Sequence, residues 1–116
     1  MVVIEPGGKV KSLPFKGDFS EIQKAVGGYV ERIALLARLP FRVDLFVDEE
    51  GIPKGLPGNL VASMVAVLGG VGYPISLYGK AVLVKPTRTG WTGLNKNETE
   101  RLFDLLHKGL GAERVK

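Results

Sequence analysis

The sequence contains no cysteine and one histidine, His107, among its 116 residues. Without cysteine, the chain cannot form disulfides, thiolate metal sites, iron–sulfur clusters or a thiol nucleophile. A single histidine cannot form a multi-histidine metal site, and its place in the last turn of a predicted helix is explained by the helix dipole, which favours a partial cation there. We therefore predict a non-enzymatic protein with no catalytic residues, no metal and no cofactor.

Long apolar runs are also missing. The longest, residues 60–68, falls well short of the roughly 20 residues that a membrane helix needs. The apolar residues after Met1 end at Glu5 and Pro6, too early for the apolar segment of a signal peptide. We expect a cytoplasmic protein that does not cross a membrane.

Acidic residues are absent between Glu50 and Glu98, although the net charge of +4 is only mildly basic. Basic residues in and around that interval alternate with aromatic ones. Basic side chains neutralise phosphates and aromatic rings stack on bases, while Arg and Trp also recur at protein interfaces. The simpler alternative is that the tryptophan holds its loop to the core and the lysines are solvated. The candidate macromolecule-binding residues are Lys80, Lys85, Arg88, Trp91 and Lys96.

The one acidic cluster, Asp48-Glu49-Glu50, lies just before Gly51. Neighbouring residues of an extended segment point to opposite sides, and the oxygen spacing of a calcium loop does not follow. We interpret the cluster as a solvated turn.

Apolar residues make up 45% of the chain, enough for one core, and 16 glycines and seven prolines indicate short elements joined by many turns. Capping residues precede each predicted helix: Asp18 with Glu21, Asn59, and Asn95 with Glu98. The pairs Ser20 with Gln23 and Asn97 with Glu100 fit the same spacing. The helices are predicted at about 19–27, 60–69 and 97–108. The second is apolar all round except for Ser63, so we expect it to be largely buried.

Alternating apolar residues predict about five short strands. The first two form an N-terminal hairpin across Pro6-Gly7-Gly8. Residues 37–40 are read as a link and 86–94 as a loop. The predicted strands cover 2–4, 9–14, 29–35, 41–48 and 75–85. The fold class is therefore α+β, with a mostly antiparallel or mixed sheet in one domain over 1–116 and a short polar tail from about 109.

Three segments carry a family resemblance, in this order: residues 21–31, ending in GGYVE; residues 47–59, VDEEGIPKGLPGN; and residues 78–84, YGKAVLV. They resemble a family of small bacterial, phage and plasmid proteins catalogued as a domain of unknown function. Asp48 stands where asparagine is usual in that pattern. The resemblance implies one compact α+β domain, often carried on mobile elements, and it transfers no catalytic residue.

From these observations we expect a non-enzymatic binding or regulatory protein that acts on another macromolecule. The expected partner is a protein, with host machinery suggested only by the resemblance. Direct nucleic-acid binding through the basic and aromatic residues is the alternative, and an enzyme whose site the sequence does not reveal is the second alternative. The sequence does not indicate an oligomeric state.

Overall fold

The N-terminal residues form the middle of the sheet in the computed structural model, which describes residues 1–36 and 40–115. Strand β1 (Val2–Ile4) is buried at every position and pairs antiparallel with β2 (Lys9–Ser12). The predicted N-terminal hairpin is thus confirmed. On its other side β1 pairs with β5 (Ala81–Pro86), a strand nearly 80 residues away in the sequence.

The sheet has seven strands in the described residues, where we expected about five, and it is mixed. Its order is β3-β4-β5-β1-β2-β7, so β3 (Val30–Ile33) lies at one edge beside β4 (Asp44–Asp48). Strand β7 (Glu113–Arg114) runs parallel to β2 at the other edge, and β6 (Trp91–Thr92) pairs with the end of β5. The α+β class is confirmed.

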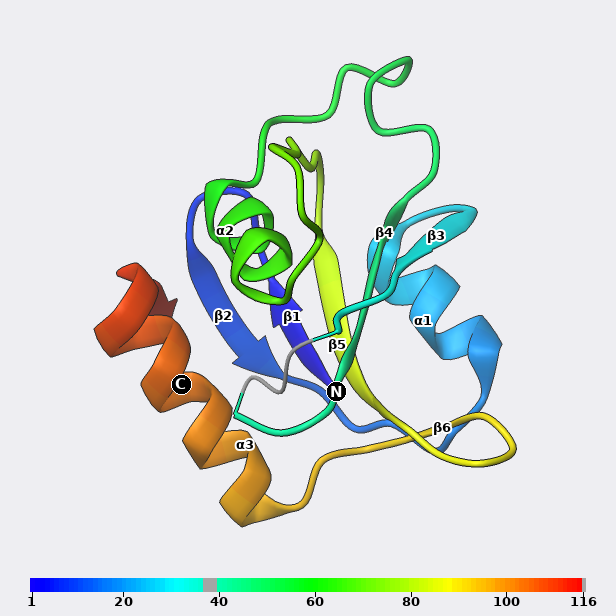
Figure 1. The fold of residues 1–116 in the computed structure, drawn as a ribbon. Helices are drawn as coiled ribbons and strands as arrows, with labels where there is room; N and C mark the ends of the chain where they lie inside the picture. The colour runs from blue at the N-terminus through cyan, green and yellow to red at the C-terminus, as the bar shows by residue number, and fades with distance from the viewer. Residues whose placement is uncertain (37–39, 116) are drawn as a thin grey trace.

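Helices cover both faces of the sheet (Figure 1). Helix α1 (Phe19–Val26) places Ile22 and Val26 in a cluster with Phe46 and Val82. Helices α2 (Leu60–Leu68) and α3 (Lys96–Asp104) pack on the opposite face in a larger cluster. Strand β4 contributes to both clusters: Leu45 and Val47 belong to the larger one and Phe46 to the α1-side cluster. Successive side chains of a strand point to opposite faces.

The predicted capping residues start all three helices. Asp18 and Glu21 form a capping box on α1, as Asn95 and Glu98 do on α3, and Asn59 caps α2. Each side-chain oxygen accepts a hydrogen bond from an N–H that would otherwise have no partner within the helix. No helix in the described part of the chain is long and apolar enough to cross a membrane.

The predicted strand over 75–85 is wrong in its first half. Residues 75–80 hydrogen-bond to the start of α2 and the preceding loop: the Leu77 N–H donates to Ser63 Oγ at 2.9 Å, and its carbonyl accepts from Asn59 N–H at 2.7 Å. These local partners occupy backbone groups that a strand would have used. Regular pairing starts only at Ala81.

Other boundaries also differ. The predicted strands 29–35 and 41–48 are confined to β3 and β4, and β6 lies within the predicted loop 86–94. In the predicted link over 37–40, residues 37–39 lie outside the described chain. Helix α3 ends at Asp104 and continues as a wider π-helical turn, η1 (Leu105–Gly109). The expected tail does not leave the domain, since Ala112 is buried and β7 adds to the sheet.

Candidate functional site

The three segments with the resemblance meet around Asp48, at the end of β4. Asp48 Oδ1 accepts a hydrogen bond from the Glu50 N–H at 2.7 Å, and Oδ2 accepts one from Lys54 Nζ at 2.8 Å. The Asp48 side chain is only 2% exposed, whereas that of Lys54 reaches solvent. Burial alone would raise the pKa of Asp48, but the bonds from Lys54 and Glu50, with the lysine charge, hold that pKa below its usual value.

Two glycines allow the close contacts of this corner. A Cβ on Gly28 would lie 2.6 Å from Lys54 Nζ, so a side chain there would displace the ion pair. Gly79 has φ +82°, and a Cβ on it would lie 2.7 Å from Leu56. These glycines bring the loop between β4 and α2 onto the strand ends. Gly27-Gly28-Tyr29 therefore acts as a structural corner, as its place after a capped helix predicts.

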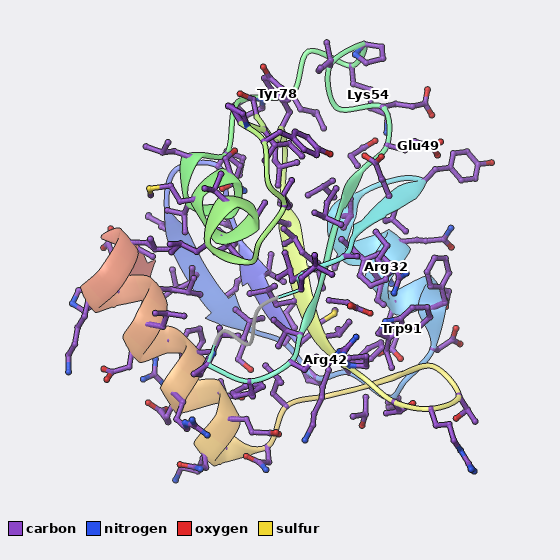
Figure 2. All side chains as sticks on the ribbon, in the orientation of Figure 1. Arg32, Arg42, Glu49, Lys54, Tyr78 and Trp91 are labelled. Carbon is purple, nitrogen blue, oxygen red and sulfur yellow. The ribbon has the colours of Figure 1, made fainter. Side chains whose placement is uncertain are left out.

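A small hollow of about 150 Å³ lies beside this corner. Figure 2 shows Glu49, Lys54 and Tyr78 at the same end of the molecule. The lining of the hollow includes Glu31, Asp48, Glu49 and Tyr78. Within residues 1–36 and 40–115, no three His, Asp or Glu side chains come together as a metal site.

Trp91 joins the β5–β6 hairpin to the sheet. Its ring makes an edge contact with Phe46, with centroids 5.3 Å apart, and lies 5.8 Å from Phe19. The indole Nε1–H donates to Asp44 Oδ2 at 2.8 Å, and Arg32 approaches the same oxygen at 3.5 Å. Trp91 is half-buried, and Asp44 is buried. These contacts match the simpler alternative, in which the tryptophan holds its loop to the core.

The four other candidate residues do not form one compact surface. Lys80 is exposed just before β5, at the opposite end of that six-residue strand from Arg88. Lys85 Nζ lies 2.6 Å from Glu98 Oε2, and this bond holds the pKa of Glu98 below its usual value. Arg88 lies in the β5–β6 turn and Lys96 begins α3, on opposite sides of the lower end of the molecule in Figure 1.

His107 lies in η1, where its Nδ1 is 2.7 Å from the carbonyl oxygen of Ala112. A hollow of about 370 Å³ adjoins it, lined also by Glu100, Asp104 and Arg114. Arg114 makes two bonds to Glu100, at 2.8 and 2.7 Å, which hold the pKa of Glu100 below its usual value. The contact between His107 and Ala112 thus helps to stabilise the turn that follows α3.

Helix α2 is less buried than its composition predicts. Val61, Ala62, Val65 and Ala66 are buried, but Leu68 is 50% exposed, and Leu60 and Val67 are exposed as well. The helix covers one face of the sheet, and its other side points outward (Figure 1). The predicted burial therefore holds for one side of the helix and not for the other, because a sheet can bury only one side of the helix that packs on it.

Other exposed apolar residues lie in segments next to the end of α2. Leu36 is 82% exposed, and its N–H donates to the Gly69 carbonyl at 2.7 Å, next to Leu68. Tyr73 is 62% exposed and shares with Leu36 a hollow of about 350 Å³. We call Leu36, Leu68 and Tyr73 the apolar patch.

The hollow beside the patch extends to strand β3. Its remaining lining is Glu31, Arg32, Ile33, Ala34, Gly70 and Val71. The residues of the apolar patch are not among the binding residues predicted from the sequence. One signal for the patch was nevertheless present, since residues 55–79 contain no charged residue. So long an uncharged stretch, with a helix at its centre, indicates either a fully enclosed helix or one with an apolar outer face.

Comparison with known proteins identifies a family. The model of the family described as "Domain of unknown function (DUF3846)" matches residues 1–107. No curated protein and no solved structure matches the chain. The match ends before β7, so the strand at that edge lies outside the family's matched region.

Proposed function

The chain belongs to the family of the DUF3846 domain, and we propose that it is a non-enzymatic protein that binds another protein through the apolar patch. The observation that carries the proposal is the exposure of Leu36, Leu68 and Tyr73 in two segments that the bond from Leu36 N–H to the Gly69 carbonyl joins. Large apolar side chains that adjoin one another on a surface are typical of protein interaction sites. Tyrosine is also enriched in interfaces, since its ring is apolar and its hydroxyl is polar.

The carboxylates beside the hollows support a role without catalysis. A carboxyl that acts as a general acid needs a raised pKa. Here the pKa values of Asp48 and Glu100 are both held below their usual values, each by a basic side chain bonded to it. Such ion pairs stabilise the ionised carboxylate and suit structural roles. An enzymatic function stays the less favoured alternative.

We extend the proposal to the setting of the protein. The family resemblance to phage and plasmid proteins favours a mobile-element protein that regulates a host protein in the cytoplasm. The patch is compatible with this setting, because it offers exposed apolar side chains that another folded protein can cover.

Capture of partners from a lysate of the native host, followed by mass spectrometry, tests the proposal. The tagged chain is compared with Leu68→Ser/Tyr73→Ser and with the control Ile52→Ser. Ile52 is also large, apolar and 71% exposed, but it lies on the loop between β4 and α2. All three positions are at least half exposed, so we expect stability to change by about 1 kcal/mol or less per substitution.

The expected result is one or more proteins that the parent and Ile52→Ser retain and the patch variant loses. Each captured protein is then purified, and its affinity for the parent and both variants is measured by calorimetry. Equal affinity for the parent and the patch variant, or no captured protein that binds in calorimetry, would overturn the proposal.

A second candidate function, direct nucleic-acid binding, has its own observation. Five basic residues belong to segments at the lower end of the molecule in Figure 1: the end of β5 and the β5–β6 turn carry Lys85 and Arg88, α3 carries Lys96 and Arg101, and Arg42 precedes β4. Of these, Lys85 makes an ion pair with Glu98, and Arg101 lies 5.7 Å from the centre of the Phe41 ring. Fluorescence anisotropy with single- and double-stranded DNA and RNA tests this function. Affinity that is absent at low salt, or that does not fall as salt rises, would exclude it.

A further inference from the structure

Among the described residues, strand β3 is the outermost strand at its edge of the sheet and pairs with β4 alone. Val30 packs with the α1-side cluster and Ile33 against the α2-side cluster. Alternation therefore points Glu31 and Ile33 toward the α2 side, and Val30 and Arg32 toward the α1 side. The hollow next to the apolar patch lies along this strand.

The backbone of β3 offers unused hydrogen-bonding groups. The Glu49 N–H donates to the Tyr29 carbonyl at 2.9 Å, and the register pairs Val30 with Asp48. In an antiparallel ladder, bonded and non-bonded pairs alternate. Residues 29, 31 and 33 therefore bond to β4, and the N–H and C=O groups of Val30 and Arg32 point away from the sheet. Within residues 1–36 and 40–115, no strand pairs with that side.

A second copy of the chain does not suit this edge. Directly opposite side chains of an antiparallel pair lie on the same face of the sheet. A two-fold axis between two copies of β3 must therefore place one residue directly opposite its own copy. An axis at Glu31 places two glutamates opposite one another, and an axis at Arg32 places two arginines opposite one another. Like charges directly opposite destabilise a pair. Self-pairing is therefore disfavoured in both registers centred on the strand.

We propose that an extended segment of the partner protein pairs with the free edge of β3 as an additional antiparallel strand. The partner residue opposite Ile33 is apolar and enters the hollow beside Leu36 and Tyr73. The partner residue opposite Glu31 is basic, because Glu31 and Glu49 are both exposed beside it and both line the neighbouring hollow. Read along the partner, the pattern is an apolar residue, any residue, then Lys or Arg.

This inference rests on the proposed function and names the kind of segment that the patch accepts. Strand addition supplies main-chain hydrogen bonds for affinity, and alternate side chains provide specificity. The middle residue of the pattern lies opposite Arg32, so its N–H and C=O both bond to β3. The N–H groups of the apolar and basic residues point to solvent.

Capped synthetic peptides test the inference without altering the protein. The probe is a peptide of threonines in which one leucine precedes one arginine by two positions. One derivative is N-methylated at the middle threonine, and its matched control is N-methylated at the leucine. A further derivative replaces the arginine by glutamate. Binding is followed by two-dimensional NMR through the backbone amides of Val30 and Arg32.

We expect saturable shifts at those amides with the parent peptide. Methylation of the middle threonine removes a hydrogen bond and inserts a methyl group between the strands, so it weakens binding by at least about tenfold. Methylation of the leucine leaves the affinity within about threefold, because that N–H makes no bond to β3. The glutamate peptide binds more weakly than the parent. No saturable shift up to about 1 mM peptide, or equal weakening by both methylations, would overturn the inference.

Two variants at one position separate this inference from the proposed function. Arg32→Pro removes the outward N–H, and proline is tolerated in an edge strand when its N–H side faces solvent. Arg32→Ala loses the same contact with Asp44 but keeps the N–H, and far-UV circular dichroism confirms that both fold. We expect at least tenfold weaker peptide binding for Arg32→Pro relative to Arg32→Ala. A partner that is lost by the patch variant but retained equally by Arg32→Pro and Arg32→Ala would sustain the proposed function and refute strand addition.

Discussion

At the scale of single residues, Trp91 shows how the same side chain fits two interpretations. Arg, Lys and Trp in one interval are typical of a binding surface. In the folded protein, however, the Trp91 ring packs against Phe46, and its Nε1–H satisfies the buried carboxylate of Asp44. The structural use of the side chain thus depends on Asp44, 47 residues earlier in the sequence.

Trp91→Phe is expected to lower the free energy of unfolding by about 1–3 kcal/mol, because the buried carboxylate of Asp44 loses its closest donor. Urea denaturation followed by far-UV circular dichroism measures the change, since the substitution removes the sole tryptophan. In an Asp44→Ala background the same substitution should cost less. An equal loss in both backgrounds would show that packing, and not the hydrogen bond, is responsible.

The lowered pKa of Asp48 predicts that the stability of the protein falls in acid. The pKa of Asp48 in the folded state lies below the value of 3.8 that it takes without these contacts. The resulting stabilisation is complete above about pH 4 and disappears as the pH falls through the lowered pKa. We expect Asp48→Asn to be less stable than the parent at pH 7, with the difference shrinking below pH 4. Thermal unfolding between pH 2 and 7 measures it.

Glu49→Gln, at the exposed neighbouring position, is the control and should keep the parent's acid dependence. A difference between parent and Asp48→Asn that stays constant from pH 7 to pH 2 would contradict the assignment of the ion pair as its source.

At the scale of elements, the two asparagine caps differ in what surrounds them. Asn59 is 1% exposed, and its side chain caps α2 while its Nδ2 donates to the carbonyls of Ile4 and Gly79 at 3.0 and 2.8 Å. It therefore connects the helix to the central hairpin and to the residues before β5. Asn95 makes the equivalent capping box on α3 at the exposed surface.

Asn59→Ala should reduce the free energy of unfolding by about 3 kcal/mol, because it removes the cap and leaves two buried carbonyls without a donor. Asn95→Ala is the matched control, with an expected cost of about 1 kcal/mol for the cap alone. Chemical denaturation of both variants makes the comparison. Equal costs would mean that the two bonds from Asn59 Nδ2 contribute little.

At the scale of the whole molecule, the two edges of the sheet differ. No described strand pairs with the outer side of β3, whereas at the other edge β7 pairs with β2 and the preceding Ala112 is buried. The N–H groups of Glu113 and Val115 donate to the carbonyls of Gly8 and Val10, both at 2.8 Å. The last described residues thus cover one edge, and the other is the edge at which we propose that a partner strand adds.

A chain shortened to residues 1–110 should fold with a melting temperature lower by about 5–10 °C, because it loses the β2–β7 pairing and the burial of Ala112. Differential scanning calorimetry provides the measurement. The control Glu113→Ala keeps the backbone bonds and should change the melting temperature by less than about 4 °C. An unchanged melting temperature in the shortened chain would show that β7 adds no stability.

Helix starts, the N-terminal hairpin and the apolar stripe of α1 could be predicted because their causes are local. A capping residue lies within three positions of the N–H it bonds, and alternation is visible within one strand. Strands of two residues, such as β6 and β7, have no periodicity to detect. Residues 75–80 alternate like a strand, yet their backbone partners lie at the start of α2 and in the loop before it.

The sequence by itself determined the α+β class, the three helices and the family, because composition, capping spacing and motifs are all written along the chain. Only the tertiary structure decided which charged and aromatic side chains already have a partner within the protein. Lys85 bonds to Glu98, Trp91 to Asp44, and Lys54 to Asp48. The tertiary structure also decided that the apolar helix α2 has an exposed side. The physical reason is that burial and pairing depend on neighbours brought together from distant parts of the chain, which no local pattern records.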